Sequence, residues 1–66
     1  MLKDLVLDYR AKHNLSASEF AKLAGVTLPT VLKIERGEKP SRLVVAKVAN
    51  ALGMSYGELV EKIDHQ

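Results

Sequence analysis

The fold is decided by residues 15–27, which read LSASEFAKLAGVT. Ser16 and Glu19 have the spacing of a capping box, in which each side chain accepts a hydrogen bond from the other's backbone amide at the start of a helix. Gly25 is a typical helix end, since glycine adopts the left-handed conformation without a steric penalty. Thr27 is a good N-cap for a following helix. The stretch therefore predicts two short helices joined by a glycine-containing turn of three to four residues, the order of a helix-turn-helix.

Similar start and stop signals divide the rest of the chain. The further stop signals are Asn14, Gly37 and Gly53, and the further start signals are Ser41 and a second capping box, Ser55-Tyr56-Gly57-Glu58. Pro29 falls in the first turn of a helix, where its missing N–H is not needed. These signals predict five helices, at about 2–13, 17–24, 28–36, 42–52 and 56–63.

Apolar residues recur at helical spacing in each predicted helix, and no segment shows the strict alternation of a half-buried strand. The faces expected to point inward are Leu2, Leu5, Val6 and Tyr9; Phe20, Leu23 and Ala24; Val31 and Ile34; Val45, Val48, Ala49 and Leu52; and Leu59, Val60 and Ile63. Helices this short are not stable alone, so they must share one core, with Val26 as an apolar plug under the turn. We therefore expect an all-α fold of five helices and one domain over residues 1–66.

Length and composition limit the class of protein. Sixty-six residues, 47% of them hydrophobic and 27% charged, are typical of one small globular domain, with a stability of roughly 3–5 kcal/mol. The chain has no cysteine, which excludes disulfides and cysteine-ligated zinc. The longest apolar run, residues 43–46, is too short to cross a bilayer, and the first residues do not resemble a signal peptide. We expect a cytoplasmic protein with no membrane partner.

No pattern in the chain points to catalysis, a cofactor or a metal. His13 and His65 have no second ligand nearby in sequence, so neither predicts a metal site. No nucleophile is placed beside a base, and there is no glycine-rich phosphate loop. We therefore expect no catalytic residues, no cofactor and no metal.

The basic residues are concentrated in the middle of the chain. Residues 10–47 contain eight lysines and arginines but three acidic residues, whereas the two ends together are acidic and the whole chain has a net charge of +2. Such a distribution can place a basic face against a polyanion, but lysines scattered over helices also serve simply to keep a protein soluble. Charge alone leaves both interpretations open.

The order of these features resembles the phage repressor and Cro-type helix-turn-helix domains, also described as lambda-repressor-like. Residues 15–27 are similar to the second helix and turn of that family, and Val31, Ile34 and residues 35–37 are similar to the end of its third helix. Similarity in the last two helices is carried by Pro40, Ser41, Ala49, residues 51–53, Ser55, Glu58 and Leu59. The resemblance extends from Val6 to Val60 and rests on ordered spacing rather than on one motif.

The resemblance implies a role for individual residues. The helix at about 28–36 would be the recognition helix in the major groove, with Leu28, Pro29 and Lys33 at base edges. Lys33 can donate to guanine, whereas Leu28 and Pro29 can read only shape and the thymine methyl group. The residues expected to contact phosphates are Ser16, Ser18, Thr27, Arg36, Lys39 and Arg42. Arg10 and Glu35 match positions that form a structural ion pair between the first and third helices.

The resemblance implies a Cro-like or minimal repressor that binds double-stranded DNA as a homodimer on an inverted-repeat operator. With five helices and no ligand-sensing segment, we expect no small-molecule ligand. A second hypothesis is a protein-interaction or antitoxin-like module on the same fold with weak DNA affinity. This alternative rests on the apolar residues Leu28, Leu32 and Met54. Recognition positions in the family are usually polar, whereas Leu28 and Leu32 are apolar.

Overall fold

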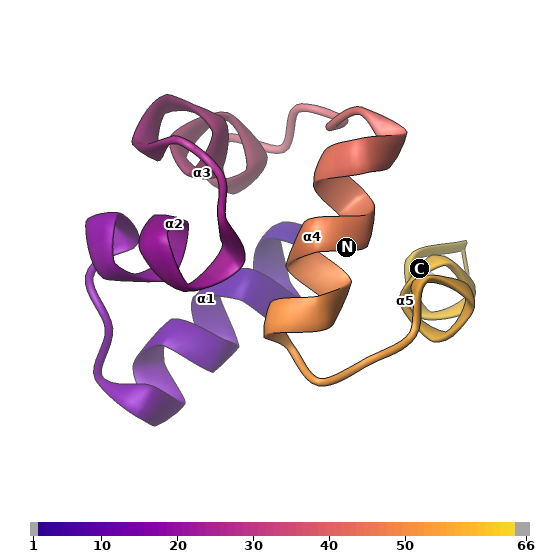
Figure 1. Ribbon diagram of the computed structural model, residues 1–66, viewed down its shortest axis with the longest axis horizontal. Helices are drawn as coiled ribbons and strands as arrows, with labels where there is room; N and C mark the ends of the chain where they lie inside the picture. Colours follow the sequence, from indigo (N-terminus) through magenta and orange to yellow (C-terminus); the bar gives the residue numbers. More distant parts are fainter. Residues whose placement is uncertain (1, 65–66) are drawn as a thin grey trace.

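Five helices make up the structure, a computed structural model in which residues 2–64 are described (Figure 1). They are α1 (Leu2–His13), α2 (Ala17–Ala24), α3 (Leu28–Glu35), α4 (Arg42–Ala51) and α5 (Tyr56–Asp64). Residues 2–64 contain no strand, so the predicted all-α fold is confirmed. The predicted ends of α3 and α4 were one residue too late, because Arg36 and Leu52 are C-caps, and α5 extends one residue further than predicted.

The predicted caps are confirmed. Ser16 Oγ accepts from the Glu19 amide at 3.0 Å and the Glu19 carboxylate accepts from the Ser16 amide at 2.8 Å. The Ser55 and Glu58 box forms in the same way, with distances of 2.9 and 3.1 Å. Thr27 and Ser41 cap α3 and α4. The residues predicted to end helices, Asn14, Gly25, Gly37 and Gly53, all have positive φ.

The core is apolar and is formed by all five helices. Its buried residues are Leu2, Val6, Phe20, Ala21, Ala24, Val31, Ile34, Val48, Ala49 and Leu59. α2 contacts α3 and α4, α1 contacts α3, and α4 contacts α5. In Figure 1, α4 lies between the first three helices and α5 at the far side. The core thus fixes α2 and α3 against each other.

The sequence prediction was wrong for Leu23, which is 54% exposed. Each residue of an α-helix advances by about 100°. The buried residues of α2 are Phe20, Ala21 and Ala24, which place the centre of its inner face between Phe20 and Ala21. Leu23 lies about 100° from that centre and therefore faces outward.

We expect Gly25→Ala to destabilise the protein by about 1–2 kcal/mol, because an alanine is strained in the left-handed region. Gly25 has φ 75°, and an added Cβ would meet no atom within 4 Å, so the cost is backbone strain alone. Gly57→Ala is the matched control. Gly57 lies in α5 with equally open space around it, and this change should stabilise the protein by about 0.5 kcal/mol. Thermal unfolding of both variants tests this, and equal effects would contradict it.

Between residues 2 and 64 no single helix is long and apolar enough to span a membrane. α4 and α5 meet the two criteria only when they are taken together, and that pair is bent by 105°.

Candidate nucleic-acid interface

α3 is held by its inner face and leaves its outer face open. Val31 and Ile34 are 0 and 1% exposed and belong to the core. Leu28, Pro29 and Lys33, the predicted base-contacting residues, are all exposed on the same short helix. An eight-residue helix fixed in this way presents a rigid surface whose side chains are free to contact a partner.

The turn before α3 is fixed at both ends. The Val26 amide donates to the Ala21 carbonyl at 3.0 Å, and Val26 packs against the core as predicted. The Lys47 ammonium group of α4 donates to the Gly25 carbonyl at 3.3 Å. Sequence reasoning did not assign Lys47 to this role, because the two residues are 22 positions apart. These contacts hold the turn against α2 and α4.

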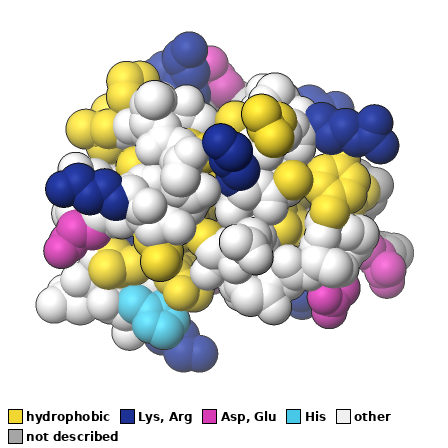
Figure 2. Space-filling model, in the orientation of Figure 1, with side chains coloured by type: hydrophobic (Ala, Val, Ile, Leu, Met, Phe, Trp, Pro, Cys, Tyr) yellow, Lys and Arg dark blue, Asp and Glu magenta, His cyan; other side chains and the backbone are white. Residues whose placement is uncertain are grey.

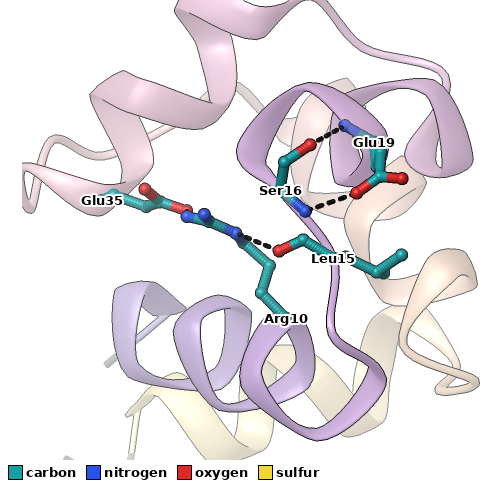
Figure 3. A network of polar contacts seen from close by, with 5 residues as sticks. All are labelled: Arg10, Leu15, Ser16, Glu19 and Glu35. Carbon is teal, nitrogen blue, oxygen red and sulfur yellow. Dashed lines mark hydrogen bonds and ion pairs between the residues drawn. The ribbon is translucent and has the colours of Figure 1, made fainter.

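Arg10 connects α1 to both ends of the helix-turn-helix (Figure 3). Its guanidinium lies 2.5 Å from the Glu35 carboxylate at the end of α3, and its Nε donates to the Leu15 carbonyl at 3.1 Å. The two charged side chains are 23 and 14% exposed, so the pair is largely removed from water. The structure therefore brings together the two residues that the family resemblance paired.

Three exposed basic residues follow α3, with Arg36 and Lys39 in the loop and Arg42 at the start of α4. Gly37, which follows the C-cap Arg36, has φ 89°, and the Glu38 amide donates to the Lys33 carbonyl at 3.1 Å. This is the hydrogen bond of a Schellman motif, which fixes the exit of the chain. Arg36 forms an exposed ion pair with Glu38 at 3.0 Å, and the Arg42 guanidinium lies 5.7 Å from the centre of the Tyr56 ring. Lys39 is exposed and forms no ion pair within residues 2–64.

At the start of α2, hydrogen bonds within the cap already occupy part of the surface predicted to hold a phosphate. The Ser16 amide is taken by the Glu19 carboxylate, whose negative charge opposes an anion there. Ser18 is exposed, and its hydroxyl group forms no hydrogen bond to the rest of residues 2–64. A phosphate at this helix start would therefore contact Ser18 and the first free amides rather than the Ser16 amide.

The start of α3 includes a residue that sequence reasoning did not assign. The Thr27 and Thr30 hydroxyl groups lie 2.8 Å apart, and Thr27 also accepts from the Thr30 amide. A hydroxyl group has one donor and two acceptor sites. If Thr30 donates to Thr27, then Thr27 keeps its own proton for a phosphate. Thr30 thus orients Thr27, a predicted phosphate contact. Its position three residues after the N-cap is the sequence feature from which this role could have been predicted.

Basic side chains spread over the side of the molecule that contains α3 and α4. In Figure 2, Lys and Arg side chains lie at the top, left, centre and upper right of the view and also at its lower edge, whereas acidic side chains lie beside some of them at the top and left and gather at the lower right, over α5. Within residues 2–64 no group of three potential ligands could hold a metal ion, and His65 lies outside the described residues.

The two capping boxes predict how stability depends on pH. The hydrogen bond from the Ser16 amide, followed by that with the Ser16 hydroxyl, lowers the pKa of Glu19 below its ordinary value of 4.5. The Ser55 amide and hydroxyl lower the pKa of Glu58 in the same way. A lowered folded-state pKa stabilises the native protein above pH 4.5, and this stabilisation is lost as the pH falls through the folded-state values.

We therefore expect Glu19→Gln to be less stable than the parent protein at pH 7 and to lose less stability as the pH falls below the ordinary carboxyl value of 4.5. Glu61→Gln removes an exposed carboxylate of α5 that caps no helix and is the control. Thermal unfolding from pH 3 to 7 measures both. An unchanged pH dependence in Glu19→Gln would show that the capping carboxylate does not stabilise the folded state.

Comparison with known proteins identifies the family to which this chain belongs. The helix-turn-helix family model matches residues 6–59. An uncharacterised HTH-type transcriptional regulator of Methanocaldococcus jannaschii is 34% identical over 59 residues, covering 88% of this chain and 89% of that protein. A second such regulator, of Methanothermobacter thermautotrophicus, is 30% identical over 64 residues, covering 96% and 93%.

A solved structure has the same fold. The crystal structure of a helix-turn-helix family transcriptional regulator from Vibrio cholerae matches 92% of this chain with a TM-score of 0.71 and 27% identity. This chain spans 35% of that longer protein, so the likeness concerns one part of it. The predicted resemblance is confirmed by the family match and by these relatives. The chain belongs to the helix-turn-helix family, and it is a DNA-binding transcriptional regulator.

Proposed function

We propose that the chain is a Cro-like or minimal repressor that binds double-stranded DNA sequence-specifically, with α3 in the major groove. The observation that carries the proposal is the orientation of α3. Its inner face is buried at Val31 and Ile34, and its outer face, with Leu28, Pro29 and Lys33, is exposed beside the basic loop that follows. A helix whose inner face is packed against the core and whose outer face is exposed has the form that enters a major groove.

The proposal separates base contacts from phosphate contacts. Lys33 donates to guanine O6 or N7, and Leu28 and Pro29 contact a thymine methyl group or read the shape of the groove. Phosphates are held by exposed groups on both sides of α3, which are Ser16, Ser18, Thr27, Arg36, Lys39 and Arg42. The Arg36 ion pair with Glu38 is exposed, so its cost of opening is small, about 0–1 kcal/mol.

The proposed assembly on DNA is a homodimer on an inverted repeat. Dimeric helix-turn-helix proteins place two recognition helices one turn of DNA apart, about 34 Å, and the operator repeats their symmetry. The chain is 66 residues long and extends only 26 Å, so one copy reaches one half-site. We propose that residues 1–66 form one DNA-binding domain without catalytic residues. The proposed location is the cytoplasm, where the protein has access to DNA.

Selection from random duplex DNA tests the proposal. We expect enrichment of an inverted repeat whose half-sites are about 10 base pairs apart. Enrichment of no sequence would overturn sequence-specific binding.

A second candidate function is a protein-interaction or antitoxin-like module, favoured by the exposure of Leu28 and Leu32 at 39 and 41%. Apolar side chains that are exposed together can mark a protein contact as well as a DNA contact. Absence of DNA binding at low salt would favour this second function, because phosphate contacts are strongest there.

A further inference from the structure

An apolar groove of about 640 Å³ opens at the far side of α3, between the start of α1, the α3–α4 loop, α4 and α5. Its walls include Leu2, Ile34, Val45, Val60 and Ile63. The volume is within the range of roughly 300–1,000 Å³ that is typical of small-molecule sites. A surface recess of this size and composition can enclose the apolar body of a small ligand.

The edge of the groove is basic. Lys3, Lys39 and Arg42 contribute to its lining from α1, the loop and α4. Among the described lining residues Glu38 is the one acid, and its carboxylate is already paired with Arg36. None of the three cations forms an ion pair within residues 2–64. A ligand that enters the groove therefore meets a positive rim and an apolar floor.

The charge of this rim favours an anionic occupant. Lys3, Lys39 and Arg42 form no ion pair within residues 2–64, so an occupant without negative charge would leave these cations uncompensated. An anionic group would pair with the basic residues of the rim, and an apolar body would pack against the apolar residues of the floor.

We propose that this groove binds an amphipathic small molecule with one anionic headgroup, such as a medium-chain carboxylate, and that this binding competes with DNA. Lys39 and Arg42 line the groove and are also proposed phosphate contacts, so an anion held between them occupies both side chains and neutralises one positive charge of the DNA surface. The competition rests on the proposed function, whereas the binding site itself does not.

The sequence predicted no small-molecule ligand. The groove is built from four segments that are distant in the chain, and no local spacing among its residues forms a motif. Its floor includes Val60, which was expected to face the core with Leu59 and Ile63 but is half-buried beside the groove. The recess exists only where these four segments pack together in the folded chain.

Binding is tested with decanoate, below the concentration at which it forms micelles, in amide NMR titrations of the whole chain. We expect saturable shifts at the groove residues, and none with acetate, which carries the charge without the apolar body. Val60→Phe fills the groove and should weaken decanoate binding by about tenfold or more. Leu7→Phe is the matched control, because Leu7 is 40% exposed and does not line the groove.

Lys3→Gln distinguishes the binding of the small molecule from the binding of DNA. Lys3 lines the groove but is not a proposed DNA contact, so this change should weaken decanoate binding about two- to fivefold, the usual effect of one exposed charge. DNA affinity without decanoate should remain that of the parent protein. With decanoate at about ten times its dissociation constant, DNA affinity of the parent protein should fall about tenfold.

Each result supports or overturns a part of the proposal. Equal decanoate binding by the parent protein and Val60→Phe, or shifts outside the groove, would overturn the site. Decanoate binding without any change in DNA affinity would overturn the competition. A dimer in sedimentation that is lost in Val60→Phe and excludes decanoate would show that a second copy occupies the groove. Absence of DNA binding without decanoate would instead contradict the proposed function and leave the NMR result standing.

Discussion

Arg10→Met should lower the free energy of unfolding by about 2–3 kcal/mol, which is roughly 10–20 °C in melting temperature for a chain of this size. Removing one member of a fully buried ion pair costs about 3–5 kcal/mol, because the other charge is left without a partner. The cost is smaller here because the side chains of Arg10 and Glu35 are 23 and 14% exposed. The Leu15 carbonyl also loses its donor.

The exposed ion pair provides a matched control for this stability measurement. Arg36 and Glu38 form a pair whose side chains are 60 and 54% exposed, so Arg36→Met should change stability by about 0.5 kcal/mol or less. Combining Arg10→Met with Glu35→Leu should restore part of the loss, since apolar residues can replace a buried pair. Equal melting temperatures for Arg10→Met and the parent protein would contradict the structural role of the pair.

Lys33→Ala and Lys39→Ala should change DNA binding in different ways. Lys33 is proposed to donate to a base edge, so its loss should cost about 1–3 kcal/mol on the operator and relax the preference at one base pair. Lys39 is proposed to contact a phosphate. Its loss should reduce operator and random-sequence affinity by similar factors and flatten the salt slope by about one unit.

The measurement is the affinity of both variants for the selected operator and for a scrambled duplex at several salt concentrations. Lys12→Ala is the control, because Lys12 is exposed on α1 and is not a proposed DNA contact. Identical profiles for Lys33→Ala and Lys39→Ala would contradict the division into base and phosphate contacts.

Most of the fold was predictable because it depends on residues close in sequence. Capping boxes need two residues three positions apart, and a left-handed helix end needs one glycine or asparagine, as at Asn14 and Gly25. The side of α2 that faces inward was harder to predict. Leu23 continues the helical spacing from Phe20, but the position of the neighbouring helices decides which residues are covered.

The site was predictable only in part. The exposure of α3 followed from its pattern, whereas individual roles and the Arg10–Glu35 pair depended on a family resemblance, since the pair joins residues 25 positions apart. The Lys47 contact and the apolar groove required the packed structure. Contacts between distant segments leave no local spacing that a sequence alone would reveal.

The central claim is that α3 reads a DNA sequence. Its most direct test is the affinity of the parent protein for the selected operator and for a scrambled duplex of equal length, measured from low to physiological salt. We expect both affinities to fall linearly with the logarithm of salt concentration, and the operator to bind about 10³-fold or more tightly than the scrambled duplex. Equal affinities for the two duplexes, or no binding at low salt, would contradict the claim.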